Sequence, residues 1–188
     1  DAAGFYRTTG NTVWWGGGER RIEPYPEGWG YQVRRQEFDS VLLQLANTAG
    51  ARVRLGKAMA RDGPKTLFRG QEIDARFTLD CSGRAGVLSR LLGYRQPERR
   101  MVAICGVLRN PTGWKLPDET HTLVEQYESG WAWSVPVSKS ERFLAFMGQK
   151  RRNFALELTK TTAFRAIFDA NQLVGAPWGR DATVYTTR

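Results

Sequence analysis

Histidine and cysteine are scarce in this sequence, and long apolar runs are missing. The single histidine, His121, cannot form a histidine–cysteine metal cluster, and a serine–histidine–aspartate triad would have to use that one residue. Two cysteines, Cys81 and Cys105, are too few for a disulfide framework, so we expect reduced thiols and a cytoplasmic protein. Because no stretch of about 18 apolar residues occurs, no membrane span is predicted.

The sequence also lacks an initiator methionine and a secretory signal. Residues 1–5 contain neither a basic segment nor an apolar one. At the other end, residues 182–185 resemble the start of a strand, and the chain stops within that pattern. We therefore expect an internal fragment of a longer protein.

Positive charge is the main bias in the composition. The 28 lysines and arginines outnumber the 19 acidic residues, which gives a net charge of +9. Such an excess fits nucleic acid or an anionic cofactor and substrate. The basic residues occur in short clusters, and neither zinc-finger spacing nor an aromatic RNA-binding motif is present. We therefore expect no nucleic-acid partner, with a basic, non-enzymatic binding module as an alternative.

Aromatic residues are abundant, and the clearest helix is at residues 37–49. The seven tryptophans, nine phenylalanines and six tyrosines exclude disorder for the chain as a whole. In the helix, apolar side chains recur at 3.6-residue spacing, and Gly50 suits its end. Strands are predicted before it at 31–35 and after it at 51–55. Strand, helix and strand in about thirty residues form a βαβ unit, which implies a parallel sheet.

The sequence pattern changes near residue 98. Before it, residues 57–70 predict a hairpin, 73–79 a strand and 87–92 a short helix. After it, a helix at about 154–170 follows four β-rich runs, at 101–109, 120–128, 131–137 and 142–148. We predict an α/β (α+β) fold, with a parallel-sheet domain in residues 1–97 and an antiparallel-sheet domain in residues 98–188.

The first candidate site is the turn Asp80-Cys81-Ser82-Gly83-Arg84, which follows the predicted strand at 73–79. Ligands of open α/β sheets bind outside the carboxyl ends of the strands. Small residues there allow close approach to the backbone, and the amides at the start of the next helix suit a pyrophosphate. The alternative is a tight strand-to-helix turn without a ligand.

Two further segments carry candidate side chains. Arg35 lies between a predicted strand and a predicted helix, where its planar fork can reach a phosphate or a flavin edge, although most such arginines are simply solvated. Trp131 and Trp133 alternate on a predicted strand that Pro136 ends, so both indoles point to one face. They form one wall of a flat apolar slot for an aromatic ring, or else belong to a core strand with two large residues.

Together these segments resemble the FAD-dependent monooxygenases of the hydroxybenzoate-hydroxylase fold, and most of all their flavin-dependent halogenase branch. The similarity covers nearly the whole chain from Thr9 and rests on three motifs: Val33-x-Arg35-x-x-Phe38-Asp39 with Gly50-Ala51-x-Val53 after the helix, Asp80-Cys81-Ser82-Gly83-Arg84 through Arg90, and Trp131-x-Trp133-x-Val135-Pro136. The third motif is the most specific for halogenases, which usually have isoleucine where Val135 stands.

The resemblance implies part of an FAD-binding, Rossmann-like domain followed by part of a substrate-binding domain. The residues implied to bind FAD are Arg35, Asp80, Ser82, Gly83 and Arg84. The residues implied to line the substrate pocket are Trp131, Trp133, Val135 and Pro136. Reduced FAD then forms a hydroperoxide that oxidises a halide or an apolar aromatic substrate, with a flavin reductase as one source of the reduced FAD. No metal ligand and no individual catalytic residue is assigned.

Three features of the family are absent from these residues. They are the N-terminal G-x-G-x-x-G motif, the later G-D-A motif and the catalytic lysine of halogenases, which lies upstream in the family. We therefore expect the fragment to be inactive alone. The first two motifs are shared with hydroxylases and reductases of the same fold, so these activities stay open as alternatives to halogenation.

Overall fold

The structure, a computed structural model, describes residues 4–16, 18–56, 58–60, 66–68, 71–94, 101–149, 153–171 and 183–186. The chain forms two compact units. The first combines Asp1–Leu42 with Arg100–Thr187, and the second consists mainly of Leu43–Arg99. The first 42 residues therefore belong with the part that follows residue 100, whereas the sequence pattern suggested a single division near residue 98.

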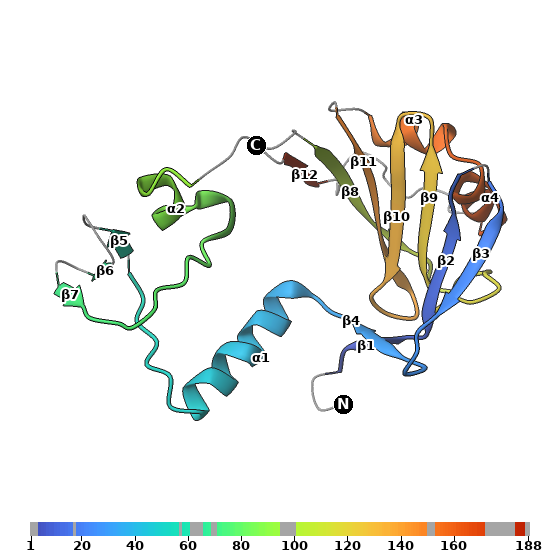
Figure 1. Ribbon diagram of the computed structural model, residues 1–188. Coiled ribbons are helices and arrows are strands. Elements are labelled where there is room, and N and C mark those ends of the chain that lie inside the picture. The colour runs from blue at the N-terminus through green and yellow to red at the C-terminus, as the bar shows by residue number, and fades with distance from the viewer. Residues whose placement is uncertain are drawn as a thin grey trace. The chain divides into compact units, whose positions relative to one another are not determined.

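A seven-stranded sheet is the centre of the first unit (Figure 1), with the strand order β12-β8-β11-β10-β9-β2-β3. Its strands are β2 (Gly10–Trp14), β3 (Arg20–Pro24), β8 (Val102–Arg109), β9 (Thr122–Tyr127), β10 (Gly130–Pro136), β11 (Glu141–Gly148) and β12 (Thr183–Thr186). All neighbours are antiparallel except β2 and β9, which are parallel. The four β-rich runs predicted after residue 98 are confirmed, and the β2–β9 pair brings the N-terminal residues into the same sheet.

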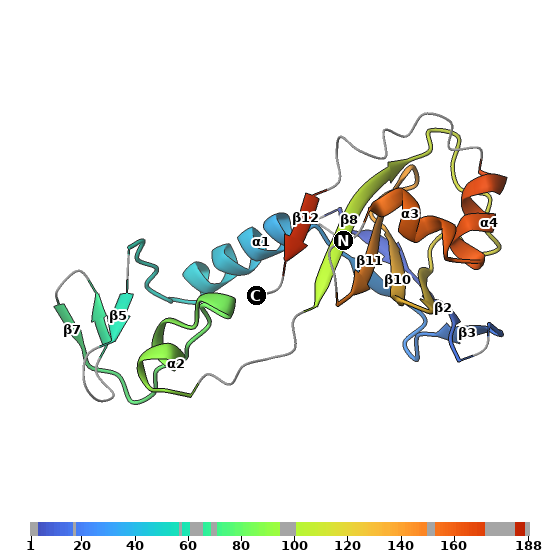
Figure 2. The same ribbon diagram turned by 90° about the horizontal axis from the view of Figure 1, so that it is seen from above.

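Two helices, α3 (Phe154–Thr159) and α4 (Ala163–Ala170), cover one face of this sheet (Figure 2). The core contains buried side chains from the sheet, the helices and the loop before β9: Ile104, Leu108, Trp114, Leu123, Ala132, Leu144, Phe146, Phe154, Phe164 and Phe168. Phe146 of β11 and Phe154 of α3 meet edge to face, with ring centroids 4.9 Å apart. A Cβ on Gly106 of β8 would lie 3.3 Å from the Phe154 ring, so glycine lets α3 pack close to the sheet.

The single helix predicted at 154–170 is wrong, because the structure contains two helices with a break at residues 160–162. The buried Glu125 of β9 accepts backbone hydrogen bonds from Thr162 (2.6 Å), Ala163 (3.1 Å) and Phe164 (2.8 Å). A carboxylate that takes the first amides of a helix satisfies donors that the helix itself cannot pair. Glu125 therefore fixes the start of α4 at Ala163.

The second unit contains a three-stranded antiparallel sheet of β5 (Ala58–Ala60), β6 (Thr66–Phe68) and β7 (Gln71–Ile73), followed by the short helices η1 (Gly83–Ala85) and α2 (Val87–Leu91). β5 and β6 confirm the predicted hairpin, whose turn at 62–64 lies outside the described residues. α2 confirms the predicted short helix. α1 (Arg35–Thr48) confirms the helix predicted at 37–49, and none of its residues is buried.

The predicted βαβ unit does not form. Residues 51–55 contain no strand, and of 73–79 only Ile73 lies in one. Their apolar side chains are exposed, Leu55 and Leu79 by 83% and Phe77 by 76%. A strand needs a neighbouring backbone to bond and a layer to cover it, and the described residues beside these segments provide neither. β4 (Gly30–Gln32), which precedes α1, pairs instead with β1 (Tyr6–Thr8) and runs antiparallel to it. The fold is therefore mixed α/β, with one parallel pair in an otherwise antiparallel sheet.

Candidate functional site

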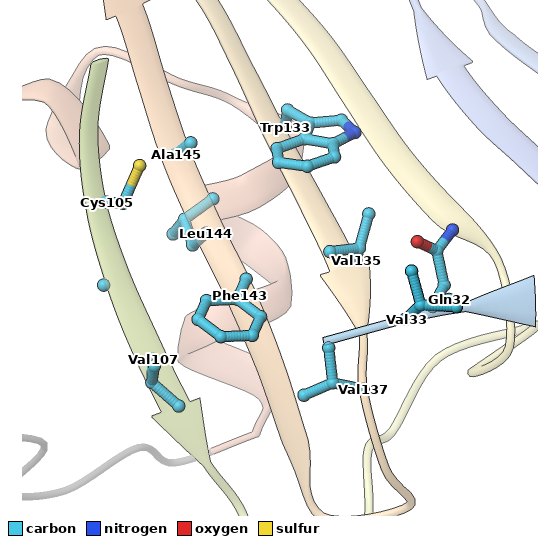
Figure 3. Close-up of a pocket in the computed structure, with 11 residues that line it drawn as sticks. Gln32, Val33, Cys105, Val107, Trp133, Val135, Val137, Phe143, Leu144 and Ala145 are labelled. Carbon is cyan, nitrogen blue, oxygen red and sulfur yellow. The ribbon is translucent and has the colours of Figure 1, made fainter. Parts of the chain in front are cut away.

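A cavity of about 210 Å³ lies on the face of the sheet that α3 and α4 leave open. Residues alternate between the two faces of a strand, so Ala132 and Leu144 enter the core while Trp133 and Phe143 point to the cavity. Figure 3 shows Trp133 on β10, Phe143 on β11 and Val107 on β8, which are neighbouring strands. The strand register forms two rows across the cavity, Trp133–Ala145–Cys105 and Val135–Phe143–Val107.

Gln32, the last residue of β4, and the two residues after it close one end of the cavity. Gln32 and Val33 line it directly. The side-chain amide nitrogen of Gln32 donates to the hydroxyl of Thr122 on β9 at 2.9 Å. The Arg34 guanidinium binds the Glu141 carboxylate of β11 at 2.7 Å. These two contacts hold the segment against the sheet at two separate strands.

Glu141 is bound by two arginines at this end of the cavity. Arg109 of β8 donates to its second oxygen at 2.8 Å. The hydrogen bond from Arg109, together with the contact of Arg34, holds the pKa of the Glu141 carboxyl below its usual value. Glu141 and Arg109 are partners in the register, one row beyond Phe143 and Val107 on the same face. The open face thus changes from apolar to charged within one row.

Cys105 is the thiol of the cavity wall. It is half-buried, and burial raises the pKa of its thiol. The other cysteine, Cys81, is exposed in the second unit. A half-buried thiol with a raised pKa holds little thiolate at neutral pH, so Cys105 suits an apolar wall better than a nucleophile.

The four residues predicted for a substrate pocket lie on both faces of β10. Trp133 and Val135 line the cavity. Trp131 points to the same face in the next row, where it pairs with Met147 and Gln126. Pro136 belongs to the opposite face and is completely buried. Two of the four therefore meet in the cavity.

Arg35, predicted to contact a cofactor, is the first residue of α1. Its Nε and Nη2 each lie 3.2 Å from a carboxylate oxygen of Asp39, one turn later in the helix. The Arg35 side chain is 79% exposed. Its planar fork therefore already holds an oxyanion group in the two-point geometry that also suits phosphate.

The predicted phosphate turn is a self-capped helix start. The Asp80 carboxylate accepts the backbone amides of Leu88 and Ser89, both at 2.9 Å, and also binds the hydroxyl and the amide of Ser82. The Ser82 hydroxyl in turn accepts the Val87 amide at 2.8 Å. The hydrogen bond from the Ser82 hydroxyl, followed by those from the amides, holds the pKa of Asp80 far below its usual range.

This capping changes what the turn can bind. Asp80 occupies the position at the start of α2 where an external anion would otherwise bind. The backbone of Gly83 is accessible, because a Cβ placed there would have no atom within 4 Å. Its φ of +59° is a conformation that favours glycine. The side chain of Arg84 lies outside the described residues. The turn lies in the second unit, and the cavity lies in the first.

Two buried polar groups have structural roles that the sequence did not reveal. Arg142, only 1% exposed, donates to the backbone oxygens of Glu119 (2.8 Å) and His121 (2.7 Å), and burial lowers the pKa of its guanidinium to about 10. His121 lies 2.9 Å from Thr12 through Nδ1 and 2.9 Å from Asp118 through Nε2. This hydroxyl–imidazole–carboxylate chain has triad-like connectivity, but burial of Thr12 and His121 leaves no path for a substrate. Both groups attach the loop before β9 to the sheet.

The described residues contain neither a metal-ligand cluster nor a membrane-spanning helix. No group of three or more metal-ligating side chains occurs in the described ranges. Within the same ranges, no helix is long and apolar enough to cross a bilayer.

The sequence matches known proteins over most of its length. A family model described as tryptophan halogenase matches residues 23–147. The tryptophan 2-halogenase of Chondromyces crocatus is 29% identical over 155 residues, which cover 73% of this chain and 30% of that protein. The 1H-pyrrole-2-carbonyl-(peptidyl-carrier protein) chlorinase of Pseudomonas fluorescens is 26% identical over 159 residues, which cover 75% of this chain and 35% of that protein.

Solved structures with the same fold include two flavin enzymes. The flavin-dependent brominase Bmp2 superposes with a TM-score of 0.75 at 22% identity, over 99% of this chain and 52% of that one. The myxobacterial chondrochloren halogenase CndH, described as an FAD-dependent halogenase, superposes with a TM-score of 0.73 at 21% identity, over 100% of this chain and 49% of that one. The chain spans about a third of the length of the curated relatives it matches and about half of that of these solved structures.

Proposed function

The chain belongs to the tryptophan halogenase family, and we propose from this that it is part of an FAD-dependent halogenase acting on a small aromatic molecule. The observation that carries the proposal is the apolar cavity on the open face of the sheet, lined by Trp133 and Val135. Both residues lie within the stretch 23–147 that the family model matches. A slot with an indole wall suits an electron-rich ring.

FAD is the cofactor in this proposal, and when bound it supplies the oxygen chemistry that oxidises a halide or the substrate. Arg35 can contact one of its phosphates, because its guanidinium is exposed and Asp39 occupies only the Nε and Nη2 donors. Gly83 fits a second contact, because its open backbone allows a phosphate to approach closely. Arg84 follows as a phosphate contact from the resemblance alone.

Asp80 and Ser82 have a different role from the one that the sequence suggested. Their side chains are already bound to the first amides of α2. We assign them as positioning residues, which hold the turn so that Gly83 presents its backbone. The cavity residues orient the aromatic ring and exclude water from it, and the contact between Arg34 and Glu141 holds the segment that closes one end.

The proposal also includes the source of the reduced FAD and the cellular compartment. A separate flavin reductase supplies reduced FAD, which follows from the resemblance to flavin-dependent halogenases. The cytoplasm is the compartment, a choice supported by the two free cysteines, one of them exposed.

A halide-dependent turnover assay tests the proposal. Protein expressed from the complete reading frame around this chain is given reduced FAD, oxygen and bromide, with a panel of indoles, phenols and pyrroles. The expected product carries bromine in place of one hydrogen, detected by its isotope pattern in mass spectrometry. The 188-residue chain is assayed in parallel, and we expect it to be inactive alone.

Two results would redirect or remove this proposal. A product that gains one oxygen without any dependence on halide would identify a hydroxylase of the same fold. Failure of every substrate on the panel, with FAD shown to be bound, would contradict the halogenase assignment.

A pair of tryptophan substitutions tests the role of the cavity. Trp133→Ala should lower turnover at least tenfold, whereas the control Trp15→Ala, at an exposed indole outside the cavity, should leave turnover unchanged.

A further inference from the structure

Gln32 places a hydrogen-bond acceptor on an otherwise apolar wall of the cavity. Most of the lining side chains are aliphatic or aromatic, and Cys105 and the indole N–H of Trp133 add only weak or donating groups. The amide oxygen of Gln32 is thus the one strong side-chain acceptor among the described lining residues. In the part of the chain that the structure describes, no group donates to it.

The side-chain amide of Gln32 is held in place by a contact with Thr122. The nitrogen of Gln32 donates to the hydroxyl of Thr122 at 2.9 Å, and Thr122 is almost completely buried on β9. In Figure 3 the amide oxygen lies on the Val135 side and the nitrogen on the far side. The backbone of the segment is held two residues later by Arg34 and Glu141. The acceptor therefore needs no rearrangement when a ligand binds.

We propose that Gln32 is a specificity-determining residue, which selects aromatic ligands that present a ring N–H or a hydroxyl to its amide oxygen. The assignment of that ligand as the substrate rests on the proposed function. The cavity of about 210 Å³ is smaller than the roughly 300–1,000 Å³ of sites for drug-sized ligands, so it suits one or two rings. A ligand of the same shape without a donor leaves the acceptor unpaired and is disfavoured.

Indole and benzofuran provide the matched probes, because they have the same size and differ in a ring N–H against a ring oxygen. Binding is read from protection of Cys105 against iodoacetamide, with each cysteine followed by peptide mass spectrometry in the 188-residue chain. Cys81 is exposed in the other unit and is the internal control. We expect half-protection of Cys105 at an indole concentration about five- to tenfold lower than that of benzofuran, with no effect on Cys81.

Two substitutions test the acceptor itself. Gln32→Met keeps the length of the side chain and should remove the preference for indole, whereas Gln44→Met on the exposed surface of α1 should leave it intact. Thr122→Val frees the amide to rotate and should reduce the preference two- to threefold, which keeps the test valid if Gln32→Met folds poorly. Equal protection by the two probes in the wild-type chain, or an unchanged preference in Gln32→Met, would overturn the proposal.

A second arm separates the substrate from the flavin, whose isoalloxazine ring also presents an N–H. FAD is titrated into the protein from the complete reading frame, wild type and Gln32→Met, and followed by quenching of flavin fluorescence. Unchanged FAD affinity with a lost indole preference supports the substrate role. Weakened FAD binding with an unchanged indole preference overturns it. Absence of halogenation with the indole preference intact would count against the proposed function and leave the role of Gln32 standing.

Discussion

In the first unit Leu144, Phe146 and Phe164 are almost completely buried, whereas in the second Phe77 and Leu79 are mostly exposed. Both sets are typical apolar core residues, so composition does not explain the difference. The first set lies on strands with neighbours on both sides or on a helix that covers them. The second set lies between short elements, where the described chain supplies neither.

This contrast separates two kinds of stability. The sheet of the first unit combines long-range pairing with a buried core, and its contribution is distributed over many strands. The helix start at Asp80 and the hairpin of β5 and β6 use contacts between residues close in sequence. Elements of that kind are only marginally stable without a core, and they add little to global stability.

The largest expected effect comes from truncating one phenylalanine in each unit. Phe146→Ala removes a ring that packs on Phe154 and should destabilise the chain by about 3–5 kcal/mol. Phe77→Ala, at a side chain that is 76% exposed, should stay within about 0.5 kcal/mol. Urea unfolding monitored by tryptophan fluorescence measures both, and equal losses would show that burial does not distinguish the units.

A smaller effect is expected at the two carboxylates that cap helices. Glu125→Ala leaves three amides at the start of α4 without their buried partner and should cost about 2–3 kcal/mol. Asp80→Ala removes an exposed cap, and water replaces it at much lower cost. The measurement is again the urea midpoint, with amide chemical shifts of Leu88 and Ser89 to show that the second cap is lost. A larger loss for Asp80→Ala than for Glu125→Ala would contradict the comparison.

The smallest effect concerns pH and Glu141. Because two arginines hold its pKa below the unfolded value of about 4.3, Glu141 stabilises the folded chain above that value. This contribution is lost as pH falls through the folded pKa. Glu141→Gln should therefore lower the free energy of unfolding by less than about 1 kcal/mol at pH 7, which is measured as a slightly lower melting temperature. At low pH the melting temperatures of the variant and the wild type should be the same. A difference that grows on acidification would be the opposite of this expectation.

Local patterns in the sequence predicted those strands and helices whose own residues show a clear apolar periodicity. The alternation at 131–137 and 142–148 correctly predicted β10 and β11, and the 3.6-residue spacing at 37–49 correctly predicted α1. The same alternation at 51–55 and 73–79 predicted strands that are absent, because a periodic pattern gives a preference and cannot supply a neighbour. Likewise, nothing between residues 154 and 170 shows that Glu125, far earlier in the chain, starts a new helix.

The candidate site was only partly accessible to the same reasoning. Trp133 was found because it alternates with Trp131 on one strand, and Val135 because it belongs to the motif that resembles halogenases; their role as substrate contacts stays a prediction. Cys105, Phe143 and Gln32 were missed, although they line the same cavity. Their position depends on the register of β8, β10 and β11 and on the hydrogen bond of Gln32 to Thr122, which joins residues 90 positions apart. Pro136 was assigned to the pocket by the same motif, but strand alternation places its side chain in the core.

The parallel pairing of β2 with β9 has a consequence for biosynthesis. The hydroxyls of Thr9 and Thr120, at the start of this seam, are 2.7 Å apart and separated by 111 residues in the chain. At a translation rate of about 5–20 residues per second, roughly 6–22 seconds pass between the emergence of β2 and that of its partner. During that interval the β2–β3 hairpin exposes an open backbone edge. The β2–β3 hairpin of the nascent chain therefore needs protection from aggregation until β9 has been made.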